Sequence, residues 1–130
     1  MGSSTRSGLN FVRLGLTPGM AGTHILPIVT NPQVAARIML TGDLVTGAEA
    51  EKLGMILKAT SADALLPEAL ALARRIASAS PVAVRATTKT IRLRTDDGIE
   101  RALWREADTQ AHVYAAADMI EGLDAVVRMI

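Results

Sequence analysis

Apolar residues recur at helical spacing through most of the chain, and alternation typical of a strand is confined to two short segments. The first is "LNFVRLGL" (9–16), in which Leu9 and Phe11 share one side. The second is "MILKAT" (55–60), a short apolar run between two helical patterns. The pattern therefore predicts an α/β fold class, mostly helical with two short strands.

A helix is predicted over "NPQVAARIMLTG" (31–42). Asn31 is a preferred N-cap residue, Pro32 suits the first helical position, and Gly42 is a typical C-terminal stop. The apolar stripe of this helix consists of Val34, Ala35, Ile38 and Met39.

Two shorter helices flank it. Residues 22–26 predict a short helix that Pro27 ends. Thr46 is followed three residues later by Glu49, which is the pattern of a capping box, so a second short helix is expected before a stop at Gly54.

The second half of the chain has an almost continuous helical pattern. After Ser61, the segment "ADALLPEALALARRIASAS" predicts a helix with one apolar face. That face consists of Leu65, Leu66, Ala69, Leu72, Ala73 and Ile76. The pair Ser80-Pro81 ends this helix and begins another, which is expected to run to about Leu93.

The last part of the chain predicts two further helical segments. "TDDG" (95–98) indicates a turn, after which a helix is expected over 99–116. Asp118 is expected to cap or punctuate the chain before the last segment, "MIEGLDAVVRMI" (119–130), in which Gly122 weakens a helix without forbidding it. Such an apolar end needs something to pack against.

Composition excludes several classes of function. Apolar residues make up 49% of the 130 residues, but there is one Phe, one Tyr and one Trp, and the net charge is +1. Nucleic acid is therefore an unexpected partner, because neither a basic face nor a stacking surface is present. The absence of cysteine excludes disulfides, thiolate zinc sites and cysteine nucleophiles.

The N-terminal "MGSSTRSG" (1–8) is polar and lacks the apolar core of a signal peptide. No later apolar run approaches the roughly 20 residues that a membrane-spanning helix needs. We therefore expect a flexible lead-in at 1–8, no membrane span and a cytoplasmic location.

The segment "RLGLTPGMAGTHILP" (13–27) places Gly15, Gly19 and Gly22 before a helix start. Their spacing matches neither a P-loop nor a dinucleotide-binding turn. Backbone amides between Gly19 and Gly22 would nevertheless face outward at a helix N-terminus, which favours a carbonyl group, a water or an anion. The alternative is a loop that only turns the chain, and the residues alone leave both open.

Other candidate chemistry is sparse. Asp108 and His112 lie four residues apart, a spacing that a metal uses, but two ligands without a third favour an ordinary i,i+4 contact. Glu106 and Asp108 are two apart on a helix and point away from each other, so they form no acid–base pair. No serine lies in a Gly-x-Ser-x-Gly turn. We expect neither a metal site nor nucleophilic hydrolysis.

Four segments resemble, in the same order, the second half of the enoyl-CoA hydratase/isomerase family, which has the crotonase fold. They are "RLGLTPGMAGTHILP", "AARIMLTGDLVTGAEAEKLGMI", "LARRIASASPVAVRATTK" and "AADMIEGLDAV". The resemblance covers about residues 9–127. It implies the C-terminal portion of a ClpP/crotonase-like fold, with the end of the β/α core at 9–60 and a helical assembly region at 61–130.

The resemblance also implies where a site would lie. A catalytic glutamate of the family stands four residues before the first glycine of the loop, and here that position is Phe11, which transfers no proton. Gly19 matches a position whose N–H orients the attacking water. Met20, Ala21 and Gly22 would line the acyl pocket together with Phe11.

In the family, roughly as many residues again precede the matched part. They supply the oxyanion hole, the other catalytic glutamate and most of the coenzyme A pocket. The implied substrate is therefore a 2-enoyl-CoA thioester bound only by a completed site, with no separate cofactor and with trimers or hexamers as the assembly. We expect this chain to be inactive alone. The alternatives are half of a split enzyme or a non-catalytic helical interaction module.

Overall fold

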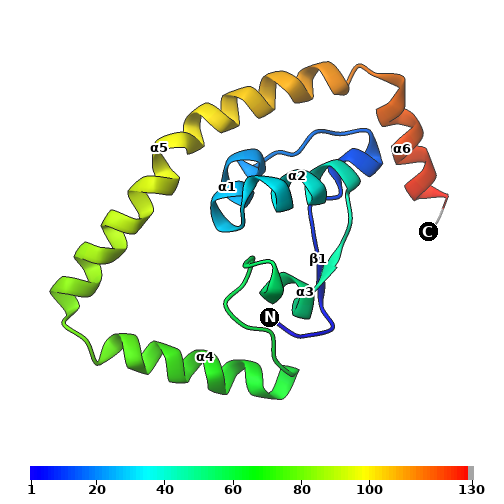
Figure 1. The fold of residues 1–130 in the computed structure, drawn as a ribbon. Coiled ribbons are helices and arrows are strands. Elements are labelled where there is room, and N and C mark those ends of the chain that lie inside the picture. Colours follow the sequence, from blue (N-terminus) through cyan, green and yellow to red (C-terminus); the bar gives the residue numbers. More distant parts are fainter. Residues whose placement is uncertain (129–130) are drawn as a thin grey trace.

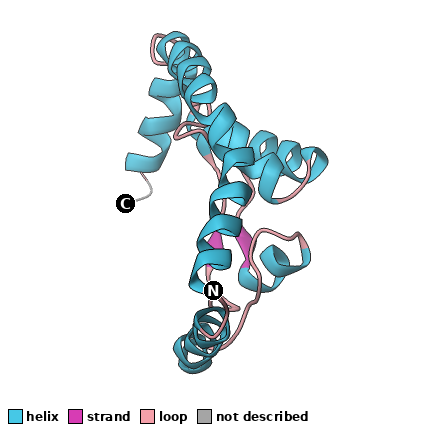
Figure 2. Cartoon of the chain, turned by 90° about the vertical axis from the view of Figure 1, so that its left-hand side faces the viewer, coloured by secondary structure: helices cyan, strands magenta, loops and turns pink. Residues whose placement is uncertain are grey.

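In a computed structural model, which describes residues 1–128, three long helices curve around a set of shorter elements (Figure 1). In chain order the elements are β1 (Arg6–Ser7), the 3-10 helix η1 (Phe11–Leu14), α1 (Gly22–Val29), α2 (Pro32–Thr41), β2 (Val45–Thr46), α3 (Gly47–Lys52), α4 (Ala62–Ala77), α5 (Pro81–Val113) and α6 (Ala117–Val127). The described structure is 69% helical with two strands, which confirms the predicted fold class. Figure 2 shows how small a part the strands are.

The helices of the first half begin and end on the residues that the sequence indicates. Asn31 Oδ1 accepts the Val34 N–H at 2.9 Å at the start of α2, and Gly42 ends that helix with a φ of 65°. At α3 the Glu49 N–H donates to Thr46 Oγ1 at 3.3 Å and the Thr46 N–H donates to Glu49 Oε2 at 2.7 Å. The predicted N-cap and capping box are therefore confirmed.

Both predicted strands are in the wrong places. Residues 11–14 form the 3-10 helix η1, and 55–60 form turns that end in a single bridge between Thr60 and Gly2. The two strands of the structure, β1 and β2, are antiparallel partners of two residues each. A short alternating run becomes a strand only where a partner lies beside it, and the sequence pattern carries no information on the partner.

Residues 1–8, expected as a flexible lead-in, have backbone partners in the structure. Arg6 pairs with Thr46 and Ser7 with Val45, and the Ser3 N–H donates to the Thr60 carbonyl oxygen at 2.9 Å. The segment therefore joins β2 and α3 to the turns before α4.

The helix α5 is continuous for 33 residues, so the turn predicted at "TDDG" (95–98) is wrong. Gly98 lies in the helix interior, and a Cβ on it would collide with the imidazole of His24. Glycine is used here for a close approach between two helices, which gives the same sequence signal as a turn. The helix ends at Val113, before the predicted Ala116.

Two further boundary predictions need correction. Pro27 does not end α1, which continues to Val29. Asp118 is not a cap, because α6 begins after Ala116 and has no side-chain cap bond. Gly122 is tolerated in α6 because its Cα faces the backbone of Leu14 in η1. Residues 129–130 of the predicted last segment lie outside the described residues.

The buried core lies almost wholly in the first half. Its buried members are Leu26, Ala35, Ile38, Val45 and Ala50. Partly buried apolar side chains pack against them, namely Leu9, Val34, Met39, Leu53, Met55 and Ile56. Outside this half, the buried residues that the structure describes are Ala102 and Glu106 on α5.

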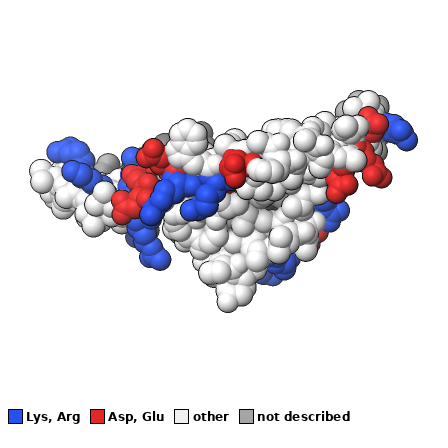
Figure 3. Space-filling model, turned by 90° about the horizontal axis from the view of Figure 1, so that it is seen from above, with Lys and Arg blue, Asp and Glu red and all other residues white. Residues whose placement is uncertain are grey.

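The apolar faces of the long helices are largely exposed. No residue of α4 is buried, and its exposed leucine and isoleucine side chains are Leu65, Leu66, Leu70, Leu72 and Ile76. Seen from above, acidic and basic residues lie beside one another and leave broad uncharged areas (Figure 3). No helix of the described chain is both long and apolar enough to cross a membrane.

Candidate functional site

The loop between η1 and α1 has an unusual backbone. Met20 and Ala21 both have a φ of 58°, in the left-handed region that residues with a side chain seldom adopt. Each such residue costs roughly 1–2 kcal/mol relative to a right-handed conformation. Surrounding contacts must therefore hold the loop in this shape.

The strongest of these contacts come from Glu106 on α5. Its Oε2 accepts the Ala21 N–H at 2.7 Å, and its Oε1 accepts the Thr23 N–H at 2.8 Å and the Thr23 hydroxyl at 2.6 Å. Ala21, at the start of α1, supplies no side-chain cap of its own. Glu106, 85 residues away in the chain, thus caps α1.

This contact changes the interpretation of the α1 N-terminus. The sequence suggests that amides between Gly19 and Gly22 hold a carbonyl group, a water or an anion. The Ala21 N–H already donates to Glu106, as does the Thr23 N–H just beyond this stretch, and the Gly22 N–H donates to the Gly19 carbonyl oxygen. An external anion at Ala21 would have to displace Glu106, so the amides of this stretch without an acceptor among residues 1–128 are those of Gly19 and Met20. The family resemblance singles out Gly19 of these two.

Gln110 lies one helical turn beyond Glu106 and contacts the other end of the loop. Its Nε2 donates to the Thr17 carbonyl oxygen at 3.1 Å. A Cβ on Gly19 would lie 2.8 Å from the same Nε2, so a larger residue there would require the Gln110 side chain to shift. Among residues 1–128, the hydrogen bonds include none donated by the Gly19 N–H. The buried Thr17 hydroxyl also has no partner there.

The other predicted site residues differ in exposure. Met20 is 78% exposed, whereas Ala21 is only 2% exposed. Phe11 is half-buried at the start of η1, where its carbonyl oxygen accepts the Leu16 N–H at 3.0 Å. Gly22 packs beside Leu9. The roles of these residues and of Gly19 stay predictions.

His24 and His112 are both engaged with backbone. His24 Nε2 lies 2.8 Å from the Thr95 carbonyl oxygen of α5, and His112 Nδ1 lies 2.7 Å from that of Asp108. The i,i+4 contact expected for Asp108 and His112 is therefore present, through the Asp108 backbone. Across residues 1–128, no group of three or more His, Cys, Asp or Glu side chains has metal-binding geometry.

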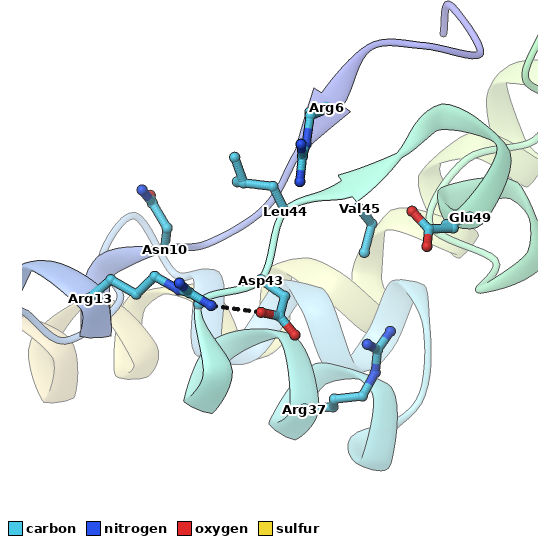
Figure 4. A pocket seen from close by; sticks show the side chains of 9 residues that line it. Arg6, Asn10, Arg13, Arg37, Asp43, Leu44, Val45 and Glu49 are labelled. Atoms are coloured by element: carbon cyan, nitrogen blue, oxygen red, sulfur yellow. Dashed lines mark hydrogen bonds and ion pairs between the residues drawn. The ribbon is translucent and has the colours of Figure 1, made fainter.

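A polar pocket of about 320 Å³ lies on another part of the surface, between β1, η1, α2 and α3 (Figure 4). Arg13 donates to Asp43 there at 2.8 Å. Two hydrogen bonds from Thr46 lower the pKa of Glu49, and the nearby Arg37 and Arg6 lower that pKa further. Three arginines and two carboxylates line this pocket, so its charges are offset only in part. The sequence pattern does not indicate the pocket, because its residues are spread from 6 to 49.

Comparison with known proteins gives the family. A family model described as enoyl-CoA hydratase/isomerase matches residues 1–128. The chain belongs to the enoyl-CoA hydratase/isomerase family. The resemblance of the four sequence segments is thereby confirmed.

Individual members of the family are also similar to this chain in sequence and structure. A crotonyl-CoA hydratase of Syntrophomonas wolfei is 34% identical over 123 residues, which are 95% of this chain and 47% of that protein. A crystal structure of an enoyl-CoA hydratase/isomerase from Pseudoalteromonas atlantica T6c matches with a TM-score of 0.86 at 26% identity, over 98% of this chain and 52% of the other. The crystal structure of a carnitinyl-CoA hydratase from Mycobacterium avium matches with a TM-score of 0.84 at 29% identity, over 98% of this chain and 50% of the other.

The chain therefore spans about half the length of these relatives. The structural matches also confirm that it has the C-terminal part of the family fold.

Sequence reasoning missed the two α5 residues that hold the loop. The sequence pattern offers Glu106 only as a neighbour of Asp108, and it offers no role for Gln110. The available signal was the line Ala102, Glu106 and Gln110, spaced by four residues, which puts a small residue and two polar ones on one helix face. A search for apolar stripes does not detect such a face.

Proposed function

We propose that residues 9–29 form one wall of a site for a 2-enoyl-CoA thioester, and that these 130 residues do not hydrate such a thioester unaided. The observation that carries the proposal is the Gly19 N–H, which has no acceptor among residues 1–128, in a loop held from α5. In this proposal it binds the water that adds to the double bond. Family membership supplies the class of substrate.

The expected inactivity rests on proton transfer. Hydration needs a group that takes a proton from the attacking water and a group that returns one to carbon. Phe11 does neither. The nearest buried carboxylate to the loop, Glu106, accepts three hydrogen bonds from the loop and α1 and is 6% exposed. No side chain of the loop itself replaces the missing acid.

Enolate stabilisation is the other requirement. Charge that develops on the thioester oxygen has to be met by preorganised N–H donors. Two amides at the start of α1, those of Ala21 and Thr23, are taken by Glu106. In this proposal the oxyanion hole comes from the part of the relatives that lies outside the match, since the chain spans about half of the Syntrophomonas wolfei protein.

The first experiment uses the pure chain. Crotonyl-CoA should keep its enoyl-thioester absorbance in the presence of the protein. Measurable hydration that Gly19→Pro abolishes would overturn the proposal that the chain is inactive alone.

The second experiment completes the site. The first half of the Syntrophomonas wolfei crotonyl-CoA hydratase is fused in front of this chain, and Phe11→Glu is compared with Phe11→Gln in the fusion. Restoring the carboxylate should raise crotonyl-CoA hydration roughly 100-fold or more. The glutamine has similar size, but its amide cannot act as a general acid or base, so it should have no such effect. Equal rates for both variants would show that residue 11 does not lie at the reacting atoms.

Assembly through the long helices is a second proposal, which the exposed apolar face of α4 favours. A groove of about 680 Å³ runs between this face and Ile56 and Leu57. By family resemblance the assembly is a trimer or hexamer, or a complex with a separate chain that supplies the missing half. Light scattering tests it, since a monomer that also fails to bind a separately produced first half would contradict both forms.

A further inference from the structure

Glu106 is a buried carboxylate on a helix that is otherwise mostly exposed. It is 6% exposed, while both neighbouring residues on α5 are exposed. A carboxylate is stable away from water only when hydrogen bonds replace its hydration. All three donors that do so belong to Ala21 and Thr23. The burial of Glu106 and the shape of the loop therefore depend on each other.

The loop needs this support because its own conformation is unfavourable. Two successive residues with side chains, Met20 and Ala21, are in the left-handed region. In that conformation the Ala21 N–H donates to Glu106. Gln110 fixes the preceding segment through the Thr17 carbonyl oxygen and lies against Gly19, where a Cβ would come within 2.8 Å of its Nε2. One face of α5 therefore holds the loop at both ends, through Gln110 and Glu106.

We propose that Glu106 is the positioning residue of the candidate site, with Gln110 as a second anchor, and that together they aim the Gly19 N–H. This inference rests on the proposed function only in taking Gly19 as the group that meets the substrate. Glu106 itself is not a catalytic residue, because both of its oxygens are occupied by the loop that it holds. The negative charge of Glu106 also interacts favourably with the positive end of the α1 dipole. Gly19 precedes α1 and is therefore left to act outside that helix end.

The test uses the full chain without any ligand, labelled with 15N-glycine. Gly19 and Gly22 report on the loop, and Gly42 and Gly54 report on the rest of the first half. Glu106→Gln keeps the size of the side chain but removes its charge. We expect both loop resonances to shift and the exchange of the loop amides with solvent deuterium to accelerate about 10- to 100-fold, as for the loss of hydrogen bonds to a charged group.

Glu100→Gln is the matched control, because Glu100 is exposed on the same helix. It removes the same charge from α5 and should leave all four glycine resonances in place. If Glu106→Gln leaves Gly19 and Gly22 unchanged, or shifts Gly42 and Gly54 equally, Glu106 does not position the loop and the inference is wrong.

A double-mutant cycle with Ala21→Gly separates positioning from a general contribution to stability. Glycine adopts a positive φ without strain, so the loop should then hold its shape with less help. Glu106→Gln should displace the Gly19 resonance much less in the Ala21→Gly background than in the wild type. Equal displacement in both backgrounds would show that Glu106 does not act through the left-handed backbone.

Gln110→Met keeps the test decisive if Glu106→Gln does not fold. Methionine has a similar length and no donor for Thr17, so the Gly19 resonance should shift while Gly42 stays. If the Gly19 resonance does not shift in Gln110→Met, Gln110 is not an anchor of the loop. If Glu106→Gln also fails to fold, that result overturns the proposal. No substrate is used in this test, so it is independent of the proposed function. If the Phe11→Glu fusion shows no gain in activity, the proposed function is refuted and the result on the loop still stands. If the loop resonances do not move, the positioning role is refuted and the proposed function still stands.

Discussion

The helices α2 and α4 have the same kind of apolar stripe, but only α2 buries it. Ile38 of α2 is 0% exposed and packs with Leu26 and Val45 in the core. Ile76 of α4 is 52% exposed, and no residue of that helix is buried. An apolar stripe therefore predicts a helix and its inner face, while the neighbouring elements decide whether that face is covered.

The helix α5 is a third case, because its inner face is not apolar at all. It meets α1 and the loop before α1 through Gly98, Glu106 and Gln110, and Ala102 is buried on the same line of small or polar residues. The α1–α5 contact is one of the most extensive between elements in the described chain. Close approach and buried hydrogen bonds thus replace an apolar seam between the two halves.

The largest expected effect comes from a change in the buried apolar stripe of α2, compared with the same change in the exposed stripe of α4. Ile38→Ala leaves a cavity in the core and should lower the free energy of unfolding by about 2–5 kcal/mol. Ile76→Ala, the same change on α4, should stay within about 0.5 kcal/mol. Urea unfolding followed by far-ultraviolet circular dichroism measures both.

If Ile76→Ala lowered the free energy of unfolding as much as Ile38→Ala does, the contrast between a covered face on α2 and an exposed face on α4 would not hold. In that event the α4 face is covered in solution. The unfolding midpoint would then rise with protein concentration, as it does when folding and assembly are linked.

The next effect concerns the contact between the two halves. Gly98→Ala places a methyl group against the His24 ring and should cost about 1–3 kcal/mol through overpacking. In an exposed helix interior the same change stabilises by up to roughly 1 kcal/mol. The sign of the change in urea unfolding therefore decides whether α5 and α1 meet as the structure has them. Thr90→Ala, at an exposed position of α5, is the control and should have little effect.

The same positions show how far the sequence predicts the fold. Local signals were reliable where the partner is a few residues away, as in the Asn31 cap and the Thr46–Glu49 box. They failed where a distant partner decides. Gly98 resembles a turn residue until His24 is placed beside it, and residues 9–16 resemble a strand that has no neighbouring strand.

The candidate site divides in the same way. The loop with Gly19 was found from the chain itself, and the family resemblance placed Phe11 at the position of a catalytic glutamate. The cap on α1 was not found, because Glu106 lies more than 80 residues from the loop and belongs to no local motif. A buried carboxylate on a helix face is identifiable only after tertiary structure supplies its donors.

The smallest expected effect tests the ion pair that connects α4 to the first half. Lys58 Nζ lies 2.9 Å from Glu68 Oε2, and Lys58 lowers the pKa of Glu68 by donating a hydrogen bond to it. Glu68 likewise raises the pKa of Lys58. The Glu68 contribution is therefore present above the ordinary carboxyl value of 4.5 and is lost as pH falls through the lower pKa of the folded protein. The Lys58 contribution is present below 10.5 and is lost as pH rises through its raised pKa.

Glu68→Gln removes the pair and isolates this dependence. At low ionic strength the wild type should melt slightly higher than the variant between these two limits, and the difference should vanish on acidification. Both side chains are largely exposed, so the difference should be far below that of Ile38→Ala, and salt should reduce it. Glu100→Gln, which removes a carboxylate from α5, should show no such acid-dependent difference. A gap in melting temperature that persists after acidification through the lowered pKa of Glu68, and in high salt, would mean that Glu68 holds α4 by packing and not by charge.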